Sequence, residues 1–435
     1  EQIFTALRLQ LLRVASLGLS GFDAPLAQTS LPEIGASLQG ISHAVSVYQN
    51  SATKKEVALL QSIVASAQQL LQRHSFDNLP RMPFIQTIIN PADAILARMQ
   101  QSLHLPIPDY LPVKWSSNAF FVNGSFNINF FTPDQGSWPT ADKIALGKKL
   151  FTDPVLSQSN KLSCASCHQP QKSFTDRLAK NKSFDGTQRL LRNTPTLLYA
   201  GLQQAQFYSM QAMHLEDQVR NVIENKEEMH GSLHSAVTAL QKNSSYKQAF
   251  AQTFRDGVTE RNIQVALASY VRSLMPFSSH FDAALKGAAK LSPEESKGFD
   301  LFMGKAKCGS CHFMPLFNGT TPPHFTHTEA EVIGVPADAL FTKVDEDSGR
   351  YNNYKIEELR SAFKTPTLRN IARTAPYMHN GVYKTLEAVI DFYDAGGAAG
   401  RGFVLPKQTL PADSLHLNSQ EKKALIAFMH TLNDE

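Results

Sequence analysis

The chain lacks long apolar runs, low-complexity tracts and concentrated basic clusters. A membrane-spanning helix needs about 20 consecutive apolar residues, so none is predicted. The most apolar N-terminal run, residues 3–19, is interrupted by Arg8 and Arg13, and we do not expect it to be a secretory signal. The net charge of +4 is small for 435 residues, which argues against nucleic-acid binding. Strand-like alternation is also rare, the best case being Ala119 to Phe131, so we predict a mainly α-helical protein of two or three domains.

Cysteine is scarce as well, and all four cysteines fall in two motifs, CASCH at 164–168 and CGSCH at 308–312. C-x-x-C-H is the attachment motif of c-type haem. Each thiol adds to one vinyl group, and the adjacent histidine is placed under the iron as proximal ligand. The sequence therefore predicts two covalent haems held by Cys164, Cys167, His168, Cys308, Cys311 and His312.

Other uses of paired cysteines explain these motifs less well. A thioredoxin-like redox pair does not require the adjacent histidine. A structural zinc site would need four ligands from one cluster, whereas the two motifs lie far apart in the chain. Covalent haem attachment occurs outside the cytoplasm, so we expect a periplasmic protein. The four propionates of two haems would bring its charge close to neutral.

Two further motifs are repeated around the cysteines. G-x-x-L-F precedes each haem motif, at 147–151 and 298–302, and T-P-T-L follows each, at 194–197 and 365–368. This pattern predicts two haem domains descended from one ancestor, 136–285 and 286–435. Ser292-Pro293 reads as a helix start. Helical periodicity is clearest in the segments 232–242, 263–274, 385–393 and 419–432.

Residues 1–104 contain no cysteine and form a separate region. Their periodicity predicts an N-terminal helical domain, and the proline-rich stretch that follows opens a linker over 105–135. The expected helices cover 2–18, 31–49, 54–74 and 90–103.

From about residue 138 to the end, the chain resembles the bacterial di-haem cytochrome c peroxidase family, which includes the methylamine-utilisation di-haem enzymes. The similarity is carried by LGKKLFTDPVLSQSNKLSCASCH, RNTPTLLYAG, EDQVRNVIENKEEM and FKTPTLRNIARTAPYMHNGVYKTLEAVIDFY. The resemblance implies that the first haem reacts with hydrogen peroxide and that the second receives and stores electrons.

The resemblance also implies a set of site residues. Gln218 and Glu228 match the distal pocket of the first haem, where a carboxylate would act as general base on peroxide. Without the resemblance, Glu228 would pass as part of a solvated helix end. The family's calcium ion between the haems would be bound by the side chain of Asn193 and the carbonyls of Thr374 and Pro376.

Two departures from the family pattern concern the first haem and the space between the haems. The loop 183–187 lacks the histidine that ligates the first haem in peroxidases requiring reductive activation. We therefore expect a five-coordinate first haem that reacts without activation. Tyr208 replaces the tryptophan between the haems and could relay an electron, while Gln211 replaces an arginine and removes a positive charge.

A third departure concerns the second haem. Tyr393 stands where ordinary peroxidases of the family place a methionine ligand, as in the methylamine-utilisation type. A tyrosinate ligand would stabilise oxidised iron and lower the haem's potential. Met378 is a rival ligand, and Tyr393 could instead be a core residue.

Three functions fit the sequence. The first is a di-haem peroxidase that reduces hydrogen peroxide with electrons from a small cytochrome c or cupredoxin. The second is an enzyme that uses peroxide to oxidise tryptophan or tyrosine side chains of a partner protein. The third is a pure electron-transfer cytochrome, which would supply a second strong ligand to each iron. In any of them, residues 1–104 could dock the protein on a larger assembly.

Overall fold

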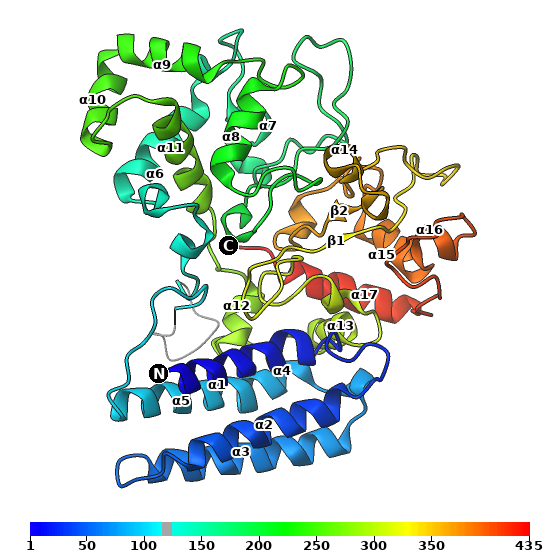
Figure 1. Ribbon diagram of the computed structural model, residues 1–435. Coiled ribbons are helices and arrows are strands. Elements are labelled where there is room, and N and C mark those ends of the chain that lie inside the picture. The colour runs from blue at the N-terminus through cyan, green and yellow to red at the C-terminus, as the bar shows by residue number, and fades with distance from the viewer. Residues whose placement is uncertain (115–123) are drawn as a thin grey trace.

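The computed structural model describes residues 1–114 and 124–435 and is mainly α-helical (Figure 1). In these residues the sheet structure is limited to two short antiparallel strands, β1 (Ala330–Glu331) and β2 (Phe363–Lys364). The prediction of a strand from Ala119 to Phe131 is wrong at its C-terminal end, because Ile128–Phe131 forms a 3-10 helix. Residues 119–123 of the predicted strand lie outside the described ranges. None of the described helices is long and apolar enough to cross a bilayer.

The N-terminal region contains the helices expected from the sequence and one that was not. The unpredicted helix α4 (Arg81–Phe84) continues through a π-helical turn into α5. This helix was not predicted because of the prolines at positions 83 and 91. Pro91 has no N–H to donate, and the π-helical turn accommodates this interruption. The other helices are α1 (Gln2–Arg13), extended by a π-helical turn to Gly18, α2 (Ser30–Ser46), α3 (Lys54–Arg73) and α5 (Asn90–Ser102).

Two sets of helices follow, one around each haem motif. The first set comprises α6 (Ala141–Thr152), α7 (Cys164–Cys167), α8 (Leu215–Glu224), α9 (Leu233–Lys242), α10 (Ser244–Thr253) and α11 (Glu260–Arg272). The second set comprises α12 (His280–Leu285), α13 (Pro293–Met303), α14 (Tyr351–Tyr354), α15 (Leu386–Asp394), α16 (Gly397–Gly400) and α17 (Ser419–His430).

The two sets repeat one helix crossing. α6 crosses α11 at Gly147, and α13 crosses α17 at Gly298. A Cβ at Gly147 would lie 1.9 Å from the carbonyl oxygen of Ala266, and one at Gly298 would lie 1.9 Å from that of Ala424. Only glycine permits backbones this close, so the repeated G-x-x-L-F motif encodes a repeated contact.

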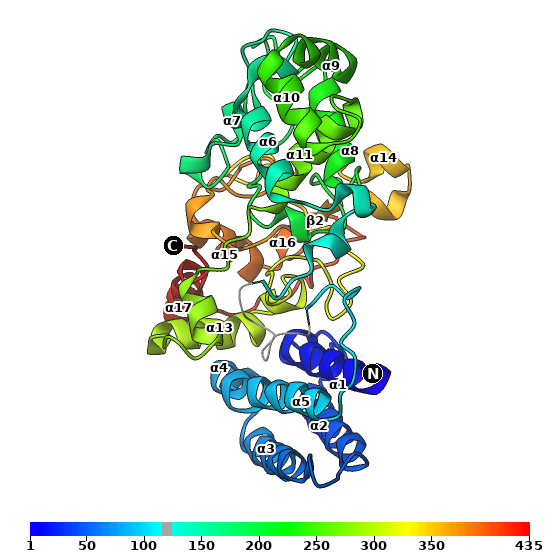
Figure 2. The ribbon, with the colours of Figure 1, turned by 90° about the vertical axis from the view of Figure 1, so that its left-hand side faces the viewer.

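The buried apolar residues form two cores. One lies within residues 146–271, around the first haem motif. The other joins the N-terminal helices to residues 281–432, around the second. Figure 2 shows α4 directly below α13, with α5 continuing below it to the right.

Polar contacts reinforce the larger core. The backbone N–H of Arg81 donates to Asp300 at 2.9 Å, and its buried guanidinium donates to the carbonyl of Leu19 at 2.9 Å. The ring of Phe22 packs edge-on against Phe313, next to the second haem histidine. The N-terminal helices are thus packed directly on the second haem region.

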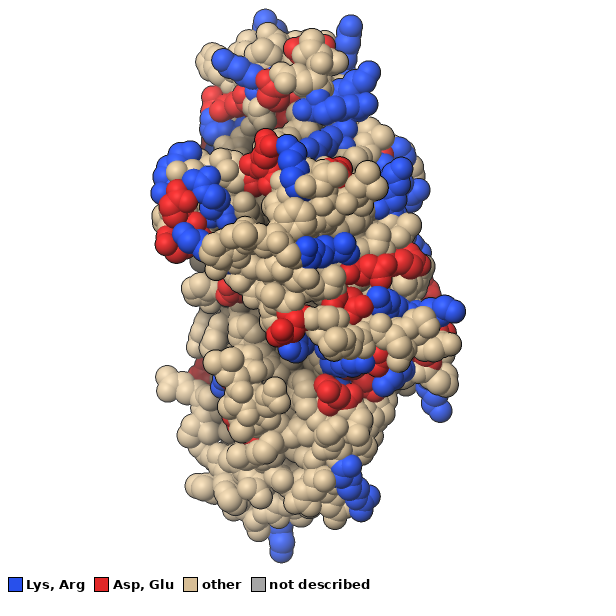
Figure 3. Space-filling view, turned by 90° about the vertical axis from the view of Figure 1, so that its right-hand side faces the viewer, with Lys and Arg blue, Asp and Glu red and all other residues tan. Residues whose placement is uncertain are grey.

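Charge is unevenly distributed on the surface that Figure 3 shows. Charged side chains are sparse over the N-terminal helices at the bottom of that view, and over the rest of it Lys and Arg are interspersed with Asp and Glu. The N-terminal surface therefore carries fewer charges than the remainder of this face.

Candidate haem and peroxide site

The first attachment motif sits on the one-turn helix α7. Ser163 caps its start, so Cys164 and Cys167 lie one turn apart. The Nδ1 of His168 donates to the carbonyl of Phe174 at 3.0 Å and also faces the carbonyl of Pro195. Burial lowers the pKa of His168, which keeps the imidazole neutral. A neutral ring with Nδ1 occupied presents Nε2 as a metal ligand.

The second motif repeats this arrangement. His312 Nδ1 faces the carbonyls of Phe317 at 3.2 Å and Pro366 at 3.1 Å. Burial lowers the pKa of His312 to about 4. The T-P-T-L repeats thus provide the same carbonyl to each histidine, from Pro195 and Pro366. Two adjacent thiols and one oriented, neutral imidazole at each motif fit c-type haem.

Glu228 lies in a turn that follows α8, close to the first motif. α8 is fixed to α11 by a buried ion pair between Glu216 and Arg272, with a shortest N–O distance of 2.6 Å. Asn225 Nδ2 donates to Glu228 Oε1 at 2.8 Å. Burial raises the pKa of Glu228. The pKa of the Cys167 thiol is raised to about 11, mainly by burial and in part by the nearby charge of the Glu228 carboxylate. A half-buried carboxylate therefore lies beside the first attachment site.

The other distal residue, Gln218, lies half-buried on α8, where its backbone N–H donates to the carbonyl of His214 at 3.1 Å. Asn225 was missed by the sequence reasoning. Its Oδ1 also accepts from the backbone N–H of Glu227 at 3.0 Å, so it both forms the turn and orients Glu228. The spacing Asn-x-x-Glu directly after a helix was the available signal.

The loop that lacks a histidine closes against this same turn. The Phe184 N–H donates to the carbonyl of Glu227 at 2.8 Å, and its ring contacts His230 edge-on. Hydrogen bonds from Ser183 and Thr187 lower the pKa of Asp185 to about 2 and hold the loop together. The loop is thus braced by its own hydrogen bonds.

Residues expected between the haems form a hydrogen-bonded chain. Tyr208 O–H donates to Asn193 Oδ1 at 2.6 Å, and Asn193 Nδ2 donates to the carbonyl of Pro376 at 3.1 Å. Thr374 lies two residues before Pro376. Among the described residues no group of three or more His, Cys, Asp or Glu is placed to bind a metal. A calcium ion here would be bound by neutral oxygens, a donor set that calcium accepts.

The positive charge expected to be missing near Gln211 is supplied by another residue. Arg192 forms a two-pronged ion pair with Asp347, at 2.7 and 3.0 Å. It also donates to Ser209 Oγ at 2.8 Å, and Ser209 donates to Gln211. The region therefore still holds a positive charge even though residue 211 is a glutamine. This charge belongs to Arg192 and is already paired with the carboxylate of Asp347.

Tyr393 lies on α15 and faces the second attachment site. Burial raises its pKa, and the Cys311 and Cys308 thiols raise it further. Glu331, which the sequence reasoning missed, interacts with both Tyr393 and Cys311. The rival residue Met378 adopts a positive φ of 70° and is partly buried against the same core.

Two half-buried histidines, each directly after a pair of cysteines, are the attachment pattern of a di-haem c-type cytochrome. Residues 141–290 match the family model described as di-haem cytochrome c peroxidase, and the chain belongs to this family. Several relatives are named as cytochrome c peroxidases, and the protein is an oxidoreductase of the cytochrome c peroxidase type.

The chain is similar both to methylamine utilization proteins and to cytochrome c peroxidases. The methylamine utilization protein MauG of Methylorubrum extorquens is 33% identical over 299 residues, which is 68% of this chain and 79% of MauG. The cytochrome c551 peroxidase of Nitrosomonas europaea is 33% identical over 253 residues, covering 58% of this chain and 72% of that protein.

Solved structures give the same picture. A MauG-like protein associated with microbial copper homeostasis aligns with a TM-score of 0.61 and 29% identity, covering 69% of this chain and 92% of that one. The di-haem peroxidase BthA of Burkholderia thailandensis aligns with a TM-score of 0.57 and 25% identity, covering 68% and 87%.

Proposed function

We propose that the protein is a periplasmic di-haem peroxidase that reduces hydrogen peroxide at the His168 haem with electrons from a small redox protein. The observation that carries this proposal is Glu228, a half-buried carboxylate beside Cys167 that Asn225 orients. When bound, the haem supplies the iron at which the peroxide oxygen–oxygen bond is broken. Glu228 takes the proton of the nearer peroxide oxygen and returns it to the leaving one.

The surroundings of Glu228 suit this proton transfer. General bases work best when their pKa is close to the working pH, and burial moves the pKa of Glu228 in that direction. An open polar depression of about 430 Å³ on the surface includes Asn225, the partner of Glu228. The depression is lined by Gln211, Asn221, Glu224, Asn225 and Asn353.

Each of the two cores would house one haem, in domains 136–285 and 286–435, with the helices of residues 1–104 packed on the second. Phe281, Ala284 and Leu285, at the end of the first range, pack in the second core. Tyr393 is the proposed second ligand of the His312 haem, since it faces both thiols of that site. Tyr208 is the proposed relay between the haems. Its O–H donates to the neutral amide oxygen of Asn193, so another base would have to take its proton when it loses an electron.

Calcium is the proposed ion at Asn193, Thr374 and Pro376. Metal analysis of the purified holoprotein should find about one calcium per chain, and a chelator should remove it and lower peroxide turnover. In Asn193→Ala the calcium content should fall with both haems retained. A protein that is fully active and free of calcium would rule the site out.

A second candidate is the oxidation of aromatic side chains on a partner protein. Tyr393 in place of methionine and the loop 183–187 without histidine favour it, as does the similarity to MauG. The two candidates differ in their product. A peroxidase consumes a reduced cytochrome c or cupredoxin in proportion to peroxide, whereas the other enzyme adds or removes mass at a tryptophan or tyrosine of its partner.

The first experiment is stopped-flow haem spectroscopy after mixing the fully oxidised holoprotein with one equivalent of hydrogen peroxide. A rapid change in haem absorption that is lost in Glu228→Gln supports the proposal. No reaction until one haem is reduced would overturn the expectation of a first haem open at rest. No reaction in either state would overturn the peroxidase assignment and leave an electron-transfer cytochrome.

A further inference from the structure

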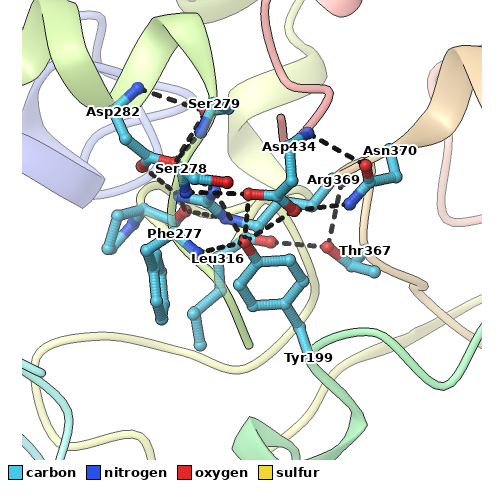
Figure 4. Close-up of polar contacts among 11 residues, drawn as sticks. Tyr199, Phe277, Ser278, Ser279, Asp282, Leu316, Thr367, Arg369, Asn370 and Asp434 are labelled. Atoms are coloured by element: carbon cyan, nitrogen blue, oxygen red, sulfur yellow. Dashed lines mark hydrogen bonds and ion pairs between the residues drawn. The ribbon is translucent and has the colours of Figure 1, made fainter. Parts of the chain in front are cut away.

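A buried polar network lies where the two haem-motif halves meet, and Tyr199 is at its centre (Figure 4). Tyr199 follows the first T-P-T-L motif as Asn370 follows the second. Both residues have left-handed backbones, with φ of 61° and 62°, and each precedes a 3-10 turn. Asparagine tolerates this conformation, but a bulky residue rarely adopts it. The tyrosine is therefore the unexpected member of the pair, and its side chain needs an explanation.

Both side chains end on one carboxylate. The Tyr199 O–H lies 2.8 Å from each carboxylate oxygen of Asp434, and Asn370 Nδ2 donates to Asp434 at 2.6 Å. The phenol oxygen also accepts from the backbone N–H of Phe277 at 2.9 Å. Tyr199 is fully buried and Asp434 is 5% exposed. The phenolic proton thus points at a buried carboxylate in a fixed hydrogen bond.

A fixed cation completes the network. The Arg369 guanidinium lies 4.8 Å from the centre of the Tyr199 ring, and its NH1 lies 3.4 Å from the phenol oxygen. Arg369 also pairs with Asp282 at 2.8 Å. A protonated, positively charged tyrosine radical is disfavoured beside this cation, whereas a neutral one is not. Loss of an electron from Tyr199 is therefore coupled to loss of its proton.

The network is joined by short backbone segments to both haem histidines. Pro195, whose carbonyl faces His168, lies four residues before Tyr199. Pro366, whose carbonyl faces His312, lies three residues before Arg369. Arg369 donates in addition to the carbonyl of Pro315, three residues after His312. Tyr199 is thus placed between the segments that support the two proximal ligands.

We propose that Tyr199 is a redox-active tyrosine that gives one electron to a peroxide-oxidised haem and its phenolic proton to Asp434. The O–H bond breaks, the carboxylate becomes a carboxylic acid, the haem gains one electron and a neutral tyrosyl radical remains. An external electron and the returning proton restore Tyr199. The proposal rests on the proposed function, because hydrogen peroxide is the oxidant.

Two other buried or partly buried tyrosines allow a sharp comparison. Tyr208 donates to the neutral amide oxygen of Asn193, which is a poor proton acceptor. Tyr246 donates to the carboxylate of Asp153 at 2.6 Å, but it lies on α10 at the outer end of the molecule (Figure 1). Tyr199 alone of these three combines a carboxylate acceptor with a position between the histidine supports.

The test uses the full-length holoprotein carrying ring-deuterated tyrosine, frozen milliseconds after mixing with hydrogen peroxide and examined by electron paramagnetic resonance. An organic radical signal that narrows on deuteration is expected in the wild type. The signal should fall at least tenfold in Tyr199→Phe and in Asp434→Asn. It should be unchanged in Tyr246→Phe, which removes the same kind of hydrogen bond elsewhere.

Haem absorption, followed in the same samples, separates the two proposals. A normal haem reaction with no tyrosyl radical in the wild type, or with an undiminished radical in Tyr199→Phe, overturns the role of Tyr199 and leaves the peroxidase intact. Absence of any haem reaction overturns the proposed function instead. If Tyr199→Phe folds poorly, radical formation that is equally fast in the wild type and in Asp434→Asn overturns the proposal.

Discussion

Glu228 owes its orientation to Asn225, three residues earlier in the same turn. We predict that Glu228→Gln lowers peroxide turnover by at least about 100-fold, since a general base contributes roughly that much or more to rate. Haem content should not change. The control is Glu227→Gln, which alters an exposed side chain and should keep near wild-type turnover. Equal loss in both variants would contradict the assignment.

The same residue makes a prediction about pH. The base must be ionised, so turnover is retained above the pKa of Glu228 and lost as the pH falls through it. Burial raises that pKa above its usual value, and the hydrogen bond from Asn225 lowers it in part. In Asn225→Ala the acidic limb of the kcat/KM profile should therefore move to higher pH. A limb that stays in place or moves to lower pH would contradict this.

We expect the side chain at position 393 to affect the reduction potential of the second haem. Exchange of the proposed tyrosinate ligand for a thioether would stabilise reduced iron. Tyr393→Met should raise the reduction potential of the His312 haem by on the order of 100 mV, a fraction of the range that axial ligands span. Potentiometric titration followed by absorption would measure this. Tyr383→Phe, at a neighbouring tyrosine, should leave the potential nearly unchanged.

Single residues differ in how far sequence reveals them. Each haem-binding cysteine and histidine can be identified because the attachment chemistry requires them to be adjacent. The contact between Tyr199 and Asp434 cannot, because 235 residues separate the partners and only the folded chain brings them together. Arg192 was overlooked for the same reason, since its partner Asp347 belongs to the other haem-motif half.

At the level of helices, the two glycine crossings predict a large effect from one methyl group. In Gly298→Ala the new Cβ would clash with the carbonyl of Ala424, and overpacking of this kind costs about 1–3 kcal/mol. The melting temperature should fall. Gly40→Ala is the matched control, because it lies on an exposed part of α2 with open space around it and should stabilise the protein by about 0.5–1 kcal/mol.

Helix boundaries were predictable where capping chemistry marks them. Ser292 and Glu295 exchange hydrogen bonds across the start of α13, as Ser292-Pro293 predicts. The alternation that ends at Phe131 was misleading. The apolar residues Phe126 and Phe131 do become buried, but in the large core without a partner strand beyond one bridge to Val113. Apolar spacing alone could not distinguish these outcomes.

For the molecule as a whole, Arg81 predicts the strength of attachment between the N-terminal helices and the second haem region. Arg81→Ala removes donors from buried carbonyls, including that of Leu19, at about 1–3 kcal/mol for each group left unsatisfied. The variant should unfold at a lower temperature, and the backbone amides of α13 should exchange their hydrogens faster. Arg98→Ala, an exposed control, should change stability by less than about 0.5 kcal/mol.

Because one core joins the N-terminal helices to residues 281–432, this core cannot be completed until residues 281–432 have been synthesised. The chain emerges from the ribosome with Phe84, Ile85 and Ile88 made early, whereas the residues 281–432 that share their core are made last. Until then the part of the core that residues 281–432 contribute is missing, and the apolar surface that they cover is exposed to aggregation. A chaperone that binds apolar helices would shield it, and truncated chains that end before residue 281 should be the species such a chaperone retains.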